Sequence, residues 1–171
     1  ALDEVWRVSG KRPLVVLGGP EASHLDDGAP LLGRCDWLLR GEGELAFREL
    51  CYAVFEGREP RCGAAIERIR RVEGHRVADA APMKLEAIDP GYRLYTPEDL
   101  ERKLCYVEAS RGCPFGCEFC LSSLDRRVRD FPLGAFLRNM DELMDRGARS
   151  FKFLDRSFNL DAARAAAIME F

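Results

Sequence analysis

Residues 111–120 read Arg-Gly-Cys-Pro-Phe-Gly-Cys-Glu-Phe-Cys and directly follow the stretch 104–110, whose apolar residues predict a strand. Cys113, Cys117 and Cys120 therefore have Cys-x3-Cys-x2-Cys spacing in a loop. Thiolates are soft ligands that suit iron–sulfur clusters or zinc, and structural zinc is usually closed by four ligands. Three thiols on one short loop instead match three irons of a cubane whose fourth iron stays open to substrate.

Two other interpretations of this loop stay open. Cys105 or a more distant thiol could complete a four-ligand zinc site, although Cys105 lies inside the predicted strand. The three loop cysteines could also be unrelated buried residues. The remaining cysteines are scattered and are predicted to be small core residues: Cys35, Cys51, Cys62 and Cys105.

The chain after the loop alternates helix and strand. Apolar residues at helical spacing predict a helix over 132–146, residues 150–154 predict a strand, and a second helix is predicted after Asp161. This order is typical of a parallel βα barrel or sheet. A complete barrel takes about 250 residues, so residues 104–171 are predicted to be the first βα units of a partial TIM-type barrel.

A second α/β region precedes the loop. The unbroken apolar run 13–18 meets a Gly-Gly-Pro turn, as a strand buried in a parallel sheet does. A strand over 37–39 and a helix over 44–56 follow. Residues 1–58 are therefore predicted to be the C-terminal part of a doubly wound, Rossmann-like α/β domain.

The middle of the chain predicts a connection between these two regions. Residues 66–79 have the pattern of two strands around a Glu-Gly turn, which indicates a hairpin. Residues 80–103 contain three prolines and little periodicity, as a connector does. We therefore expect residues 59–103 to form a hairpin and a linker.

Composition narrows the class of protein. The 171 residues are 47% hydrophobic and 32% charged, with a net charge of −3, which favours a globular fold over a nucleic-acid-coating protein. No apolar run approaches the roughly 20 residues that span a bilayer, and no signal-peptide pattern is present. We expect a cytoplasmic location without nucleic-acid or membrane partners, and seven cysteines that are thiols or metal ligands, not disulfides.

The two ends of the sequence suggest a longer protein. Leu2, Val5 and Trp6 predict one face of a helix that closes at Gly10, although no methionine begins the chain. The helix predicted after Asp161 stops at the last residue. We therefore expect the sequence to be a fragment.

The cysteine motif, with an aromatic residue before its last cysteine, resembles the signature of radical S-adenosylmethionine (SAM) enzymes. The wider string 108–123 is similar to the subgroup that carries an N-terminal cobalamin-binding domain. Phe151-Lys-Phe-Leu-Asp-Arg-Ser-Phe-Asn159 resembles the second barrel strand of a poorly characterised branch of that subgroup. The strings 16–23 and 39–44 resemble the closing part of the cobalamin domain. Together the resemblance covers residues 16–56 and 104–171.

That resemblance implies a [4Fe–4S] cluster on Cys113, Cys117 and Cys120, with SAM chelating the open iron and Phe119 shielding one cluster face. An external one-electron reductant, such as flavodoxin or ferredoxin, would drive cleavage of SAM to a 5′-deoxyadenosyl radical. This radical would abstract hydrogen from an unknown small-molecule or peptide substrate.

The commonest chemistry of the cobalamin-binding members is methyl transfer from methylcobalamin, so the resemblance implies a transferase. Two alternatives stay open. One is radical SAM cyclisation, rearrangement or oxidation without methyl transfer. The other is a non-catalytic iron–sulfur or zinc binding module.

The Gly-Gly-Pro turn is a second candidate site. Glycines after a buried strand let a cofactor approach the backbone, but they equally predict a tight turn. The resemblance favours cobalamin contact by Gly18, Gly19, Pro20 and Ser23. His24 lacks the flanking residues and spacing of the usual cobalt-binding histidine and is expected to be a loop residue.

Polar residues near the predicted strand 150–154 and the loop complete the candidates. Asp155 and Asn159 follow the carboxyl end of that strand, where βα-barrel enzymes keep functional groups, so one of them is expected to contact SAM or substrate. Turn or cap chemistry is the alternative for both. Glu108 and Arg111 flank the loop and could form an ion pair or contact SAM.

Overall fold

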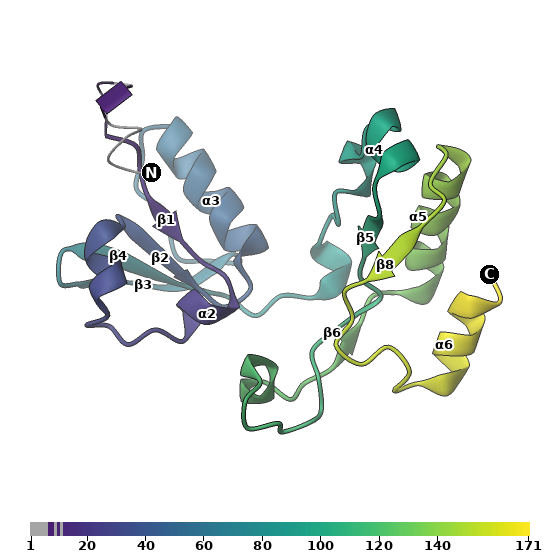
Figure 1. Ribbon diagram of the computed structural model, residues 1–171. Coiled ribbons are helices and arrows are strands. Elements are labelled where there is room, and N and C mark those ends of the chain that lie inside the picture. The colour runs from purple at the N-terminus through teal and green to yellow at the C-terminus, as the bar shows by residue number, and fades with distance from the viewer. Residues whose placement is uncertain (1–6, 9, 11) are drawn as a thin grey trace. The chain divides into compact units, whose positions relative to one another are not determined.

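The protein is described from a computed structural model that covers residues 7, 8, 10 and 12–171 (Figure 1). The helix expected at Leu2, Val5 and Trp6 lies outside the described residues. Contacts divide the chain into two units, the first ending at Met83 and the second beginning at Lys84. None of the described helices has the length and apolar character needed to cross a membrane.

The first unit contains a four-stranded sheet in the order β1-β2-β4-β3. Its strands are β1 (Val16–Leu17), β2 (Trp37–Arg40), β3 (Ile66–Val72) and β4 (His75–Ala80). β1, β2 and β4 run parallel, whereas β3 pairs antiparallel with β4. The predicted hairpin is confirmed, and Glu73 (φ 45°) and Gly74 (φ 93°) have the positive φ angles of a tight hairpin turn.

The hairpin, which was expected as a separate segment between the two α/β regions, pairs with the first sheet. β4 pairs with β2 over four residues, and Val77 and Ala78 are fully buried. Burial of apolar side chains on both faces of β4 makes the hairpin part of the first unit's core.

Helices cover both faces of the first sheet. α3 (Gly43–Phe55) packs Leu50 against Trp37 and Leu39 on one face. On the other face, η1 (Pro30–Arg34) packs Leu32 against Leu38, and Ala22 of α2 (Pro20–Ser23) joins the same cluster. The carboxyl end of β1 leads into residues 18–23, which include the short helix α2. The carboxyl end of β2 leads into residues 41–43, at the start of α3.

The second unit contains two pairs of strands. Parallel β5 (Cys105–Val107) and β8 (Phe151–Phe153) form one pair, and antiparallel β6 (Ser110–Arg111) and β7 (Arg129–Asp130) form the other. The helices are η2 (Leu85–Ala87), η3 (Tyr92–Leu94), α4 (Pro97–Arg102), η4 (Leu121–Leu124), α5 (Leu133–Asp145) and α6 (Ala162–Met169).

α5 supplies much of the second core. Phe136, Met140 and Leu143 are buried in one cluster with Cys105 and Val107 of β5. The helix predicted over 132–146 is thus confirmed, because its apolar residues recur at helical spacing on one face.

α4 occupies part of the expected connector. Thr96 and Asp99 form a capping box at its start, and Leu100 is 2% exposed in the second core. The second half of the predicted linker therefore folds with the second unit. Both units combine helices with parallel strands, which confirms the α/β class.

Candidate functional site

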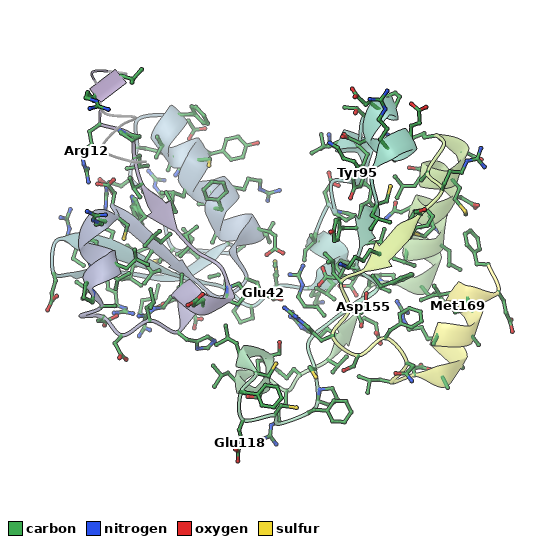
Figure 2. All side chains as sticks on the ribbon, viewed as in Figure 1. Arg12, Glu42, Tyr95, Glu118, Asp155 and Met169 are labelled. Carbon is green, nitrogen blue, oxygen red and sulfur yellow. The ribbon has the colours of Figure 1, made fainter. Side chains whose placement is uncertain are left out.

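The loop that carries the cysteine motif, residues 112–128, connects β6 to β7 and is called the cysteine loop. Gly112 has φ +108°, and a Cβ atom there would lie 1.9 Å from the Arg127 carbonyl oxygen. Only glycine tolerates both this backbone angle and this close approach. The two ends of the loop are thus drawn together, while Glu118 lies near its far end (Figure 2).

The first motif cysteine contacts the segment after β8. Cys113 Sγ lies 3.4 Å from the Ser157 hydroxyl oxygen. The hydrogen bond with Ser157, a hydrogen bond from the Phe115 N–H and the charge of Arg156 lower the pKa of the Cys113 thiol. Cys113 is therefore biased toward the thiolate form, which is the form that binds metals.

The other two motif cysteines lie in a turn stabilised by the backbone. The Cys120 N–H donates to the Cys117 carbonyl at 3.1 Å, and the Ser123 hydroxyl donates to the Cys120 carbonyl at 2.7 Å. Cys117 is exposed and Cys120 is half-buried, and neither is in a disulfide. Both thiols are accordingly free to ligate.

The chemistry of these donors fits an iron–sulfur cluster. All seven cysteines are free thiols, and three of them share the cysteine loop. Within the part of the chain that the structure describes, no three His, Cys, Asp or Glu side chains are gathered closely enough to hold a metal ion. Three thiolates on an exposed loop with fixed ends suit a cluster around which the loop closes.

Phe119 is 95% exposed. Its expected role in shielding a cluster stays a prediction.

Asp155 binds the chain ahead of the cysteine loop. Its carboxylate accepts hydrogen bonds from the N–H groups of Ala109 (3.0 Å) and Ser110 (2.6 Å) and from the Ser110 hydroxyl (2.7 Å) (Figure 2). Asn159, by contrast, has an exposed side chain. A small open cavity lies beside Asp155 and Ser157 and has room for ordered water.

Glu108 and Arg111 form an ion pair. Arg111 donates to both carboxylate oxygens, at 3.1 and 2.8 Å, and its guanidinium lies 6.0 Å from the centre of the Phe131 ring. Both side chains are about three-quarters buried. The ion pair is therefore the alternative that the structure supports for these two residues.

The structure also identifies residues that sequence reasoning missed. Ser157 contacts Cys113, and Arg164 of α6 contacts both ends of the cysteine loop. These partners are 33 to 55 residues apart in the sequence, so no local pattern indicates them.

The second candidate site lies at the carboxyl ends of β1 and β2. Gly18, Gly19 and Pro20 are exposed, and Gly19 has φ +99°. The Ser23 hydroxyl donates to the Gly19 carbonyl at 2.8 Å and accepts from the Gly41 N–H at 3.0 Å. Ser23 thus joins the loop after β1 to the loop after β2, at the edge where open α/β sheets bind ligands.

An ion cluster holds the next part of the same loop. Asp27 accepts from Arg40 at 2.9 Å and from Arg70 at 2.7 Å, and Arg40 also donates to the Leu25 carbonyl at 2.6 Å. The hydrogen bond from Arg70, followed by the charges of Arg70 and Arg40, lowers the pKa of Asp27 despite partial desolvation. The loop is therefore fixed to β2 and β3.

Neither histidine side chain forms a hydrogen bond at this site within the described chain. His24 is exposed, as a loop residue was expected to be. His75 is 3% exposed, and its ring nitrogens have no hydrogen-bond partner among the described residues.

Known proteins resemble the chain in sequence, although no family model matches it. It is 32% identical to the uncharacterized methyltransferase PH0819 of Pyrococcus horikoshii over 166 residues, 90% of this chain and 36% of that protein. It is 33% identical to the 2-(S-pantetheinyl)-carbapenam-3-carboxylate methyltransferase of Streptantibioticus cattleyicolor over 125 residues, 63% of this chain and 17% of that protein. The chain thus spans about a third or less of these relatives.

Solved structures resemble the chain in fold. The radical SAM methyltransferase TsrM of Kitasatospora setae, with cobalamin and a [4Fe–4S] cluster bound, matches with a TM-score of 0.65 and 21% identity, covering 99% of this chain and 35% of that one. A TsrM structure with tryptophan substrate and a SAM analogue matches with a TM-score of 0.64 and 20% identity, covering 99% of this chain and 34% of that one. The chain is thus similar in sequence to proteins named methyltransferases and similar in fold to a radical SAM methyltransferase that binds cobalamin and a [4Fe–4S] cluster.

Proposed function

We propose that the chain is part of a cobalamin-dependent radical SAM methyltransferase. Residues 104–171 would provide the first βα units of a TIM-type barrel, and residues 1–58 the C-terminal part of the cobalamin-binding domain, extended by the hairpin β3–β4. The observation that carries this proposal is the set of free thiols on the cysteine loop, which follows β6 a few residues after parallel strand β5, in a chain similar to methyltransferases.

In this proposal Cys113, Cys117 and Cys120 hold a [4Fe–4S] cluster. A cluster held there would supply the electron, taken from an external reductant of the flavodoxin or ferredoxin class, for reductive cleavage of a C–S bond of SAM, which precedes hydrogen abstraction from the substrate. Ser157 orients the Cys113 thiolate from the segment after β8. Phe119 would turn toward the cluster and limit its contact with water.

Asn159 is the stronger candidate for contact with SAM or substrate at the end of β8. Its side chain is exposed, whereas the Asp155 carboxylate is already occupied by three hydrogen bonds from Ala109 and Ser110. The Asn159 amide can both donate and accept hydrogen bonds, which is what binding the carboxylate and amino groups of SAM requires.

Cobalamin would lie at the carboxyl edge of the first sheet and supply the methyl group. The exposed backbone of Gly18 and Gly19 lets a bulky ring approach, and Pro20 and Ser23 fix the turn that presents it. Ser23 thus serves this site through its hydrogen bonds to Gly19 and Gly41.

Anaerobic reconstitution with iron and sulfide tests the proposal. Electron paramagnetic resonance of the reduced chain should show a [4Fe–4S]⁺ signal that shifts when SAM is added. The triple variant C113A/C117A/C120A should lose the signal, whereas Cys62→Ala should keep it, because Cys62 is an exposed thiol outside the loop.

Two outcomes would count against the proposal. Zinc at one ion per chain without sulfide would indicate a binding module. A SAM-responsive cluster in a chain that leaves the visible spectrum of added cobalamin unchanged would favour radical chemistry without methyl transfer. Transfer of a labelled methyl group from SAM to cobalamin by the parent protein would support the methyltransferase.

A further inference from the structure

Two charged side chains from the segment that begins after β8 hold the two ends of the cysteine loop. Asp155 accepts from the N–H groups of Ala109 and Ser110, as described above. Arg164, on α6, donates to the Ala109 carbonyl at 3.0 Å and to the Phe131 carbonyl at 2.7 Å. Ala109 precedes β6 and Phe131 follows β7, so Arg164 bridges the chain entering the loop and the chain leaving it.

Ala109 is the point where these contacts meet. Its N–H donates to a carboxylate, and its carbonyl accepts from both a guanidinium and the Phe131 N–H at 3.0 Å. Hydrogen bonds to charged groups are shorter and stronger than neutral ones, and burial strengthens them further.

Burial supports a specific role for these contacts. Ala109 is 1% exposed, Ser110 is 7% exposed, and the Arg164 side chain is 15% exposed. Arg164 Nε also lies 3.6 Å from the Asp130 carboxylate of β7. A buried arginine is stable only where its several N–H groups have hydrogen-bond or ion-pair partners at fixed positions.

We propose that Asp155 and Arg164 are positioning residues that fix both ends of the cysteine loop, so that its three thiols reach the same cluster. This inference rests on the proposed function. The loop between these ends is mostly exposed and has only the short helix η4. The separation and direction of its ends therefore govern where Cys113 and Cys120 lie relative to each other.

The two residues differ in what they hold. Asp155 fixes only the entering chain, through Ala109 and Ser110, whereas Arg164 fixes the entering and the leaving chain together. Loss of Arg164 should therefore loosen both ends, and loss of Asp155 only the first.

The test uses the 171-residue chain as wild type and as Arg164→Met, Arg164→Lys, Asp155→Asn and Arg149→Met. Arg149 is an exposed control, for which the structure shows no hydrogen bond or ion pair in its described part. Amide hydrogen exchange is measured at Ser110 and Phe131 without metal. Iron and sulfide per chain, and the rate of iron loss to a chelator, are measured after anaerobic reconstitution.

For Arg164→Met we expect at least tenfold faster exchange at Phe131 and at least fivefold faster iron loss. Arg164→Lys should recover part of both, because one ammonium can donate to either carbonyl but lacks the planar fork. Asp155→Asn should speed exchange at Ser110 more than at Phe131. Arg149→Met should match the wild type.

An Arg164→Met chain that melts earlier but exchanges and loses iron at wild-type rates below its melting point would overturn the inference. Faster exchange with an unchanged rate of iron loss would also overturn it, since the role would then be structural only. A wild-type chain that takes up no iron and sulfide would instead overturn the proposed function. The exchange rates, measured without metal, would still show whether Asp155 and Arg164 hold the loop ends.

Discussion

The two candidate loops each follow a short strand, β1 in the first unit and β6 in the second, but they are held in different ways. The loop after β1 is stabilised by its own Ser23 hydroxyl, which bonds Gly19 four residues earlier and Gly41 of the neighbouring loop. The cysteine loop is held at its ends by Asp155 and Arg164, which come from a distant segment. Its far part carries the thiols and is largely exposed.

This difference indicates how each site would respond to its cofactor. A loop fixed by short-range hydrogen bonds and by the Asp27 ion cluster is already in place, so binding there costs little conformational entropy. A long exposed loop with fixed ends must order around its ligand, so metal binding and loop structure are coupled.

The largest effect that would sharpen this comparison is expected at Gly112. Gly112→Ala would place Cβ against the Arg127 carbonyl at a φ of +108°, and a side chain at such an angle alone costs about 1–3 kcal/mol. We expect a loss of roughly 3 kcal/mol in unfolding free energy and poor cluster retention, measured by urea unfolding and iron content.

Gly116→Ala is the matched control within the same loop. A Cβ there would meet only the guanidinium end of Arg126, a flexible side chain that can move away. Gly116→Ala should change the free energy of unfolding by no more than about 0.5 kcal/mol. Equal costs for the two variants would contradict the view that only the ends of the cysteine loop are tightly fixed.

Local patterns in the sequence predicted much of this fold. The helices α3 and α5, the strands β2 and β8 and the hairpin β3–β4 lie within a few residues of where apolar periodicity and turn signals indicated them. α4 was missed although Thr96 and Asp99 form a capping box, because the prolines around it favoured a connector. Phe47 and Val54, which lie at the helical spacing that predicted α3, are about half exposed, because the buried face of this helix carries the small residues Ala46 and Ala53 beside Leu50.

Long-range pairing explains what the sequence could not predict. β4 joins the first sheet through its register with β2, in which Trp37 is opposite Arg76, and no signal within the hairpin specifies that neighbour. The cysteines could be predicted because their spacing is local. Ser157 and Arg164 could not, because a serine or an arginine has many surface roles and these contacts span at least 33 residues.

A smaller effect is expected at Ser23 in the first unit. Ser23→Ala removes the hydrogen bonds to Gly19 and Gly41. Water can take the place of the Ser23 hydroxyl at this edge of the sheet, so the free energy of unfolding, measured with urea, should fall by only about 1 kcal/mol. Ser122→Ala is the control, since Ser122 is half-buried and its hydroxyl forms no hydrogen bond within the described chain. A cost above about 3 kcal/mol for Ser23→Ala would show that this loop, too, depends on one critical anchor.

The smallest effect concerns acid pH and the Asp27 ion cluster. The hydrogen bond from Arg70, aided by the charges of Arg70 and Arg40, holds the pKa of Asp27 below its ordinary value. Because the folded pKa is lower than the unfolded one, the stabilisation is complete above about pH 4 and is lost as the pH falls below it. The carboxylate is 44% exposed and screened by water, so the effect should be slight and should weaken further in high salt.

Tryptophan fluorescence can isolate this effect, because Trp37 lies in the first unit and the second unit contains no tryptophan. The urea midpoint followed by this signal should fall between pH 5 and pH 3 in the wild type and fall less in Asp27→Asn. Asp99→Asn is the control. Hydrogen bonds with Lys103 and Thr96 lower the pKa of Asp99 to about 2, but Asp99 caps α4 in the second unit. If Asp27→Asn and the wild type lost stability equally as the pH falls, the loop after β1 would owe its order to Ser23 and to packing. The difference between this loop and the cysteine loop, which charged side chains hold at its ends, would then be larger.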